Sequence, residues 1–182
     1  TSVGRAARLI FLNKTCYNGL YRVNASGGFN VPHGRYVRPR IADEAALTAA
    51  SRALQGVALH AHDFEKACAD ARPGDFVYLD PPYQPLSATS RFTGYTSGEF
   101  GPAQQRRLRD CFAALAAREV YAVLSNSDHE AVHELYPDDA YHITSVPMSR
   151  AINSRATHRA PIPELLIANF TLDATGHARF VR

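Results

Sequence analysis

Apolar and polar positions follow two patterns along most of this chain. Short apolar runs are typical of strands, and apolar positions every three or four residues are typical of helices. Asp43 is expected to cap a helix that stops near Gly56, and Pro102 suits a first helical turn. The pattern predicts helices over residues 5–15, 43–54, 63–71, 102–118 and 130–135, and strands over residues 57–61, 76–79, 120–124, 141–146 and 164–170. This alternation predicts an α/β fold with a mostly parallel sheet, or with the last two strands as an antiparallel edge.

Glycine, asparagine and proline interrupt the pattern between residues 17 and 36. Ser26-Gly27-Gly28 separates two short runs, residues 21–23 and 29–31, and this arrangement predicts a hairpin. Arginines follow the hairpin and also lie in a predicted basic loop, residues 150–159. Residues 84–101 are rich in Ser, Thr and Gly without a clear period, which indicates a long functional loop.

Composition excludes several classes of protein. Of the 182 residues, 46% are hydrophobic and 20% charged, so the chain can build an ordinary core and is not a disordered protein. Its three cysteines are far apart without metal-ligand spacing, which excludes a disulfide framework and a zinc finger and indicates reduced thiols in the cytoplasm. No apolar run approaches the roughly 18 residues of a membrane span. The net charge of +3 is compatible with a polyanionic partner but does not identify one.

The strongest chemical signal is the tetrad Asp80-Pro81-Pro82-Tyr83, which directly follows the apolar run of residues 76–79. Two prolines end a strand abruptly, because each lacks an N–H and restricts its predecessor. The acid and the aromatic ring then project from the carboxyl edge of the sheet, where open α/β folds bind ligands. An ordinary turn after a strand is the plainer interpretation.

This tetrad suits an exocyclic amine as substrate. The N6 lone pair of adenine is delocalised into the ring and is a poor nucleophile. If the Asp80 carboxylate accepts one N6–H and the Pro81 carbonyl the other, the nitrogen becomes pyramidal and directs its lone pair at an electrophile, while an aromatic ring stacks on the base. Because this amine lies inside a duplex, the base must first be flipped out.

At this point the sequence resembles the Dam-type DNA adenine-N6 methyltransferases. The resemblance lies in the tetrad, in residues 17–22 (Tyr-Asn-Gly-Leu-Tyr-Arg), in residues 29–36 (Phe-Asn-Val-Pro-His-Gly-Arg-Tyr), in residues 85–95, in residues 124–128 (Leu-Ser-Asn-Ser-Asp) and in residues 150–166. It covers almost the whole chain in order. It implies a partial Rossmann-like methyltransferase sheet with a small helix and hairpin region for DNA recognition, S-adenosylmethionine as cofactor and double-stranded DNA as partner.

The resemblance also implies roles for individual residues. Asp80, Pro81, Pro82 and Tyr83 become the catalytic tetrad, and Asp63, Phe64 and Asp80 contact the cofactor. Arg22 becomes the reader of a guanine, and Tyr17 fills the gap that the flipped base leaves. The DNA contacts implied are Lys14, Tyr17, Asn18, Leu20, Arg22, Pro32, Arg35, Tyr36 and Ser87. Direct methyl transfer without a metal ion, at GATC sites, is the activity implied.

One part of the family pattern is missing. Family members open with a glycine-rich loop that cradles the methionine part of the cofactor, and no glycine cluster precedes Lys14. The chain also begins at Thr1 rather than Met. We therefore expect a fragment, inactive by itself, in which residues 1–42 complete a DNA target-recognition region and residues 43–182 a catalytic domain. We also expect the strand that carries the tetrad to have an unpaired edge.

Alternatives remain open at this stage. The chain can be an inactive DNA-binding module, or a methyltransferase for another planar amine or amide, such as a protein glutamine. His60 and His62 lack a third ligand for a metal, and His129 and His133 are interpreted as a solvated helix face. Residues 125–128 are expected in a loop that lines the cleft, and phosphate contact by Arg150, Arg155 and Arg159 is an even alternative to simple solvation. A restriction, regulatory or phage role stays open.

Overall fold

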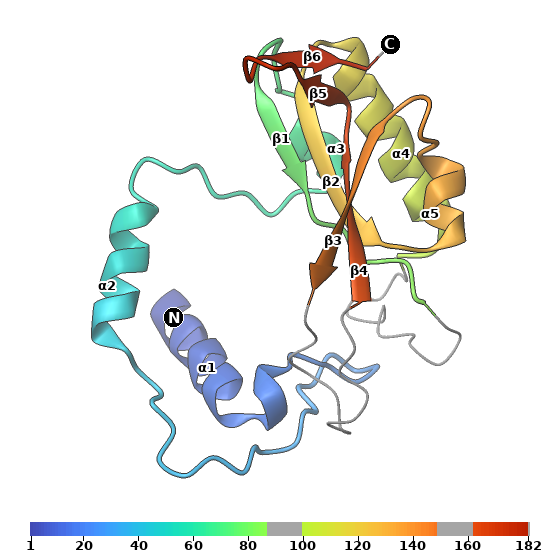
Figure 1. Cartoon of the computed structure of the whole chain (residues 1–182). Helices are drawn as coiled ribbons and strands as arrows, with labels where there is room; N and C mark the ends of the chain where they lie inside the picture. The colour runs from blue at the N-terminus through green and yellow to red at the C-terminus, as the bar shows by residue number, and fades with distance from the viewer. Residues whose placement is uncertain (87–99, 149–161, 182) are drawn as a thin grey trace. The chain divides into compact units, whose positions relative to one another are not determined.

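A computed structural model describes residues 1–86, 100–148 and 162–181 of this chain (Figure 1). Contacts group the chain into two units, Thr1–His60 and Ala61–Arg182, and each is described by itself. By contacts, the helix that follows Asp43 belongs to the first unit. The functional boundary between residues 42 and 43 stays a prediction.

The first unit contains two helices and a short 3-10 turn. Helix α1 (Ser2–Thr15) leads into the turn η1 (Tyr17–Gly19), and α2 (Glu44–Ala53) follows a long connection. The N-cap predicted for α2 is confirmed, because the Asp43 carboxylate accepts a hydrogen bond from the Ala46 N–H at 3.0 Å. The predicted hairpin is present as well. Val23 bridges Phe29, and Asn24 closes the turn through its side-chain oxygen, which accepts from the Gly28 N–H at 2.8 Å.

The second unit is built on a mixed four-stranded sheet. Its strands are β1 (Phe76–Leu79), β2 (Tyr121–Ser127), β3 (His142–Met148) and β4 (Ile162–Ala168), in the order β1-β2-β4-β3. Only β1 and β2 are parallel, and β4 runs antiparallel to both of its neighbours. The prediction of a mostly parallel sheet is therefore wrong for these strands, and the alternative of an antiparallel edge is confirmed.

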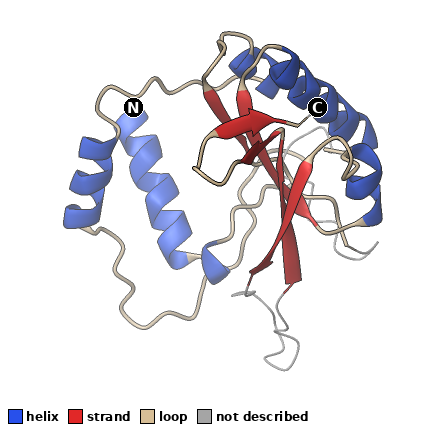
Figure 2. Cartoon of the chain, turned by 45° about the horizontal axis from the view of Figure 1, so that its top comes forward, coloured by secondary structure: helices blue, strands red, loops and turns tan. Residues whose placement is uncertain are grey.

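Helices α3 (Phe64–Cys68), α4 (Pro102–Ala117) and α5 (Glu130–Leu135) complete this unit (Figure 2). Pro102 occupies the first turn of α4, as predicted. The apolar face of α4 supplies Leu108, Phe112 and Leu115, each at most 1% exposed, to a core shared with β2 and β4. Figure 1 shows α4 and α5 along one side of the sheet. None of the helices in residues 1–86, 100–148 and 162–181 has the length and apolar character to cross a membrane.

Three predicted elements differ from the structure. Residues 57–61 form no strand, and Leu59 is 72% exposed, so the alternation of this range does not mark a buried sheet face. The predicted strand 164–170 divides at Asn169 into β4 and β5 (Phe170–Leu172). The pattern also missed β6 (Ala178–Phe180), which pairs with β5 in a hairpin.

Strand β1 lies at an edge of this sheet and was expected to be buried. Only Leu79 is buried, whereas Phe76 and Tyr78 are 61% and 54% exposed. Among the described strands, β1 pairs with β2 alone, so its other edge carries unpaired backbone groups. The expectation of an unpaired edge on the strand that carries the tetrad is confirmed for this part of the chain.

Candidate active site and DNA-contacting surface

The tetrad follows β1 at the carboxyl end of the parallel pair. The register of β1 and β2 aligns Leu79 with Leu124, which places Asp80 beside Ser125. The Ser125 hydroxyl donates a hydrogen bond to Oδ1 of Asp80 at 3.0 Å. Asp80 is itself exposed, and within residues 1–86, 100–148 and 162–181 no hydrogen bond joins its Oδ2. One carboxylate oxygen is thus fixed and the other is accessible to a ligand.

Buried amide side chains hold the residues that follow Asp80. Asn126 is fully buried, and its side-chain oxygen accepts hydrogen bonds from the backbone N–H of Gln84 and Ser127, both at 2.9 Å. Gln105 of α4 donates to the Pro82 carbonyl at 3.2 Å and accepts from the Asn126 amide at 3.3 Å. The segment after the strand is therefore fixed by polar contacts from β2 and α4.

Residues 125–127 were expected in a loop, and this expectation is wrong. Strand β2 continues through Ser127, which pairs with Glu164 of β4. The side chains still line the site, because this end of β2 lies beside the tetrad. Asp128 follows the strand and pairs with His133 at 2.8 Å, and His129 caps α5 by accepting from the Ala131 N–H at 3.1 Å. Both histidines therefore have local roles on α5.

The aromatic ring of the tetrad is anchored from the far end of the sequence. The Tyr83 hydroxyl donates a hydrogen bond to Oε2 of Glu164 at 3.1 Å. Burial, as the largest cause, raises the pKa of Tyr83, and the negative charges of Glu164 and Asp80 raise it further. The phenol therefore stays protonated and can keep donating to Glu164. The sequence did not single out this role of Glu164, because its partner lies 81 residues away.

A pocket of about 420 Å³ adjoins the tetrad. The residues predicted to contact the cofactor line it together with the two prolines of the tetrad: Asp63, Phe64, Asp80, Pro81 and Pro82. Phe100 packs edge-on against Phe64, with ring centroids 6.2 Å apart. Carboxylates bind hydroxyls and amines, and aromatic faces bind purine rings, so these side chains fit the adenosyl part of S-adenosylmethionine.

Asp63 and its neighbours are held by an arginine that the sequence analysis did not identify. Oδ1 of Asp63 caps α3 by accepting from the Glu65 N–H at 3.1 Å. Arg107 of α4 pairs with Asp63 at 3.1 Å and with Glu65 at 2.6 Å. Hydrogen bonding to Glu65 is the largest cause that raises the pKa of Arg107. One arginine among the sixteen residues of α4 gave no signal in the sequence, since its acidic partners Asp63 and Glu65 lie at α3.

In the first unit, the predicted DNA-contacting residues cluster around the end of α1. The Tyr17 N–H donates to the Pro32 carbonyl at 2.8 Å, and the Gly34 N–H donates to the Thr15 carbonyl at 2.7 Å. A Cβ on Gly34 would lie 2.9 Å from the Cys16 carbonyl oxygen, so only glycine permits this close approach. The structure brings together the following predicted residues, exposed except for the half-buried Leu20: Lys14, Tyr17, Asn18, Leu20, Arg22, Pro32, Arg35 and Tyr36.

The predicted guanine reader is oriented by a neighbour on the hairpin. Arg22 donates through Nε to the Asn30 side-chain oxygen at 2.9 Å and through Nη2 to the Asn30 carbonyl at 3.0 Å. A guanidinium carries five N–H groups, and within residues 1–86, 100–148 and 162–181 no hydrogen bond uses its far end, Nη1 and the second N–H of Nη2. That pair of donors matches the O6 and N7 acceptors of a guanine.

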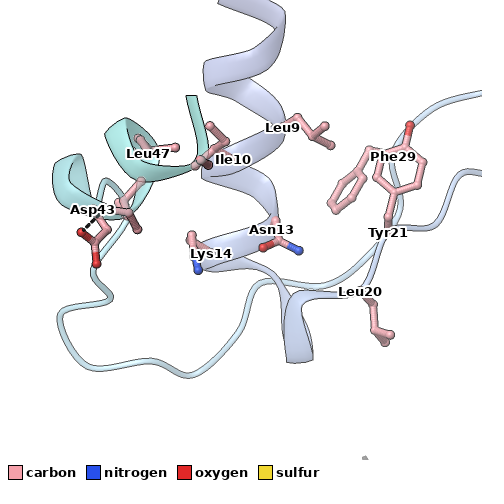
Figure 3. Close-up of a pocket in the computed structure, with 12 residues that line it drawn as sticks. Leu9, Ile10, Asn13, Lys14, Leu20, Tyr21, Phe29, Asp43 and Leu47 are labelled. Atoms are coloured by element: carbon pink, nitrogen blue, oxygen red, sulfur yellow. Dashed lines mark hydrogen bonds between the residues drawn. The ribbon is translucent and has the colours of Figure 1, made fainter. Parts of the chain in front are cut away.

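An apolar pocket of about 560 Å³ lies behind this surface, within the first unit (Figure 3). Leu9 and Ile10 of α1, Leu47 of α2 and the Tyr21 and Phe29 rings line it. Two predicted DNA contacts, Lys14 and Leu20, also belong to its lining. Ser87, the remaining predicted contact, and the arginines of residues 150–159 lie outside the described residues.

Comparisons with known proteins identify the family of this chain. Residues 1–152 match the D12 class of N6 adenine-specific DNA methyltransferases. The chain belongs to this methyltransferase family. Similar relatives include the type II methyltransferase M1.LlaDCHI of Lactococcus lactis subsp. cremoris, 42% identical over 93% of the chain, and the type II methyltransferase M.MjaIII of Methanocaldococcus jannaschii, 45% identical over 92%.

The DNA adenine methylase of Escherichia coli K12 is 36% identical over 89% of the chain. These matches cover 57–60% of the length of the relatives. The chain thus spans about three fifths of the D12 methyltransferases that it resembles. The resemblance to Dam-type enzymes is confirmed as a family relationship.

Proposed function

We propose that this chain carries the catalytic tetrad and the target-recognition hairpin of an S-adenosylmethionine-dependent DNA adenine-N6 methyltransferase acting at GATC sites, and that it is a fragment of that enzyme. The observation that carries the proposal is the position of Asp80, fixed through Oδ1 at the end of β1 and beside a pocket that Asp63 and Phe64 line. Family membership supports DNA adenine over a protein amide as the substrate.

The cofactor supplies an electrophilic methyl group when it is bound. In this proposal, the Phe64 ring lies against the adenine of the cofactor, and the Asp63 and Asp80 carboxylates accept hydrogen bonds from its polar groups. The pocket lining supports this assignment, since it joins those side chains to Pro81 and Pro82 of the tetrad.

The tetrad acts on the flipped adenine in three ways. Oδ2 of Asp80 accepts one N6–H, because Oδ1 already accepts from Ser125. The Pro81 carbonyl accepts the second N6–H, and the two bonds direct the nitrogen lone pair toward the methyl group. The Tyr83 ring stacks on the base while its hydroxyl stays bonded to Glu164. The N6 proton that is displaced by methylation passes to the Asp80 carboxylate or to water.

The hairpin selects the site. Arg22, held by both the side chain and the backbone of Asn30, presents its free guanidinium end to one guanine. Tyr17 occupies the gap of the flipped base, and Leu20, Pro32 and Tyr36 complete the base contacts. The GATC sequence itself follows from the Dam-type resemblance of these residues. The exposure of the Tyr17 and Tyr36 rings, 48% and 44%, supports their use in binding.

Asp80→Ala, made in the enzyme that contains this chain, tests the catalytic role. We expect single-turnover methyl transfer to be abolished, with the affinity for duplex DNA unchanged within a few-fold, because Asp80 lies outside the hairpin unit. Asp70→Ala is the matched control, since this exposed aspartate does not line the pocket. Near-normal turnover of Asp80→Ala would contradict the assignment. A wild-type protein that binds DNA but transfers no methyl group would instead support an inactive DNA-binding module.

A further inference from the structure

Arg107 of α4 itself lines the proposed cofactor pocket and also contacts helix α3. Its guanidinium contacts three consecutive residues: Nη2 pairs with Oδ1 of Asp63 at 3.1 Å and with Oε2 of Glu65 at 2.6 Å, and the guanidinium carbon lies 4.9 Å from the Phe64 ring centroid. Nε adds a second bond to Glu65 at 3.2 Å. Nη1 donates to Gln104 at 2.6 Å, one turn earlier on α4.

These contacts fix orientation more than they add stability. The paired bonds from Nε and Nη2 to one carboxylate set the plane of the guanidinium, and that plane lies over the Phe64 ring. Arg107 is 38% exposed at its side chain, and a salt bridge with such exposure adds little to folding. Oδ1 of Asp63 accepts hydrogen bonds from both Arg107 and the Glu65 N–H of the α3 cap, so this oxygen is held from two sides.

A different arginine already attaches α3 to α4. Arg118, at the other end of α4, donates to the backbone carbonyls of Cys68 at 3.3 Å and Ala69 at 3.1 Å, and also to Ala71. Helix docking therefore does not depend on Arg107. Unlike Arg118, Arg107 contacts the side chains of Asp63 and Phe64, which line the pocket.

We propose that Arg107 is a positioning residue of the cofactor pocket: it holds the Asp63 carboxylate and the Phe64 ring in the arrangement that receives the adenosyl group. This proposal rests on the proposed function, which assigns Asp63 and Phe64 to the cofactor. It assigns to Arg107 no contact with the reacting atoms.

The test measures binding without catalysis. The isotope-labelled chain is titrated with S-adenosylhomocysteine into the millimolar range, and the backbone amide signals of Phe64 and Glu65 are followed by NMR. We expect Arg107→Met to raise the dissociation constant roughly two- to tenfold, the range that corresponds to ordering side chains upon binding. Arg109→Met is the matched control, because Arg109 lies on the same helix, pairs with its neighbour Asp110 and does not line the pocket.

Glu65→Gln separates positioning from direct contact. Glu65 does not line the pocket, yet it is the residue that Arg107 contacts most closely. We expect this variant to weaken binding as well, though less than Arg107→Met, with its amide spectrum otherwise unchanged. Glu65→Gln also carries the test if Arg107→Met fails to fold.

Three negative results are distinguishable. If the wild-type chain binds and both Arg107→Met and Glu65→Gln bind equally well, Arg107 has no positioning role and the cofactor assignment stands. If Glu65→Gln alone binds as the wild type, Arg107 acts by direct contact and the positioning role is wrong. If the wild-type chain shows no shift at Phe64 or Glu65 in the millimolar range, both the pocket assignment and the role of Arg107 are wrong.

Discussion

Replacement of Asn126 by alanine tests whether the buried amide network holds the tetrad. The Asn126 side chain is fully buried and makes three hydrogen bonds, to the N–H groups of Gln84 and Ser127 and to the Gln105 side chain. Each such bond contributes about 1 kcal/mol net, and a buried donor left without a partner costs more. We therefore expect Asn126→Ala to lower the free energy of unfolding by about 2–4 kcal/mol, a large share of the stability of a domain.

The functional part of this prediction is local. The Asn126 oxygen is the acceptor for the Gln84 N–H, directly after the tetrad, so its removal frees that backbone while Gln105 still bonds the Pro82 carbonyl. Amide hydrogen exchange at Gln84 should then become faster than global unfolding alone allows. The turnover number of the complete enzyme should fall accordingly, because Tyr83 lies between the two anchors.

Asn169→Ala is the matched control. Asn169 is 2% exposed and also uses both ends of its amide, accepting from the Ala122 N–H and donating to the Val120 carbonyl, each at 2.9 Å. Urea unfolding followed by circular dichroism should show similar losses of stability for both variants. Only Asn126→Ala should expose the Gln84 amide. A stability loss under about 0.5 kcal/mol, or equal Gln84 exchange in the two variants, would refute the reasoning.

Three further predictions concern specificity, the cofactor and the core. Arg22→Ala should cost about 1–3 kcal/mol of discrimination at one guanine, whereas Arg150→Ala should weaken binding to all DNA sequences alike and reduce its salt dependence. Binding titrations on cognate and non-cognate duplexes measure both effects. An equal loss of affinity for the two duplexes with Arg22→Ala would contradict the guanine contact. Calorimetric titration of the 182-residue chain with S-adenosylmethionine should show no micromolar binding. The reason is that no glycine cluster before Lys14 lets the backbone approach the methionine part of the cofactor. Micromolar binding would mean that another segment replaces the glycine-rich loop. Burial, as the largest cause, raises the pKa of Tyr136, whose hydroxyl has no hydrogen-bond partner in the described residues. Above about pH 10 this phenol therefore ionises in the unfolded state but not in the folded state, and the free energy of unfolding falls there. Tyr136→Phe should raise the free energy of unfolding by about 1 kcal/mol and reduce that alkaline loss; a destabilised variant in urea unfolding at neutral and alkaline pH would show that the hydroxyl has a partner.

Features with a local cause could be predicted from the sequence alone. The Asp43 cap, Pro102 in the first turn of α4, and the turn at Ser26 to Gly28 each depend on neighbouring backbone groups, and each is confirmed. The position of the tetrad at a strand end also has a local cause, since two consecutive prolines cannot continue a β-ladder. The order of motifs was enough to identify the methyltransferase family.

Tertiary structure decided which elements became neighbours. The sequence pattern predicts strands over residues 57–61 and 164–170, but a strand forms only where another strand accepts its hydrogen bonds. The second range contributes to β4, which pairs with β2, whereas residues 57–61 form no strand. For the same reason β4 inserted antiparallel between β2 and β3, against the parallel expectation. That insertion brought Glu164 to Tyr83 across 81 residues, and the packing of α4 on α3 brought Arg107 to Asp63 across 44. Side-chain contacts at such separations depend on the packing of whole elements, and no local sequence pattern records them.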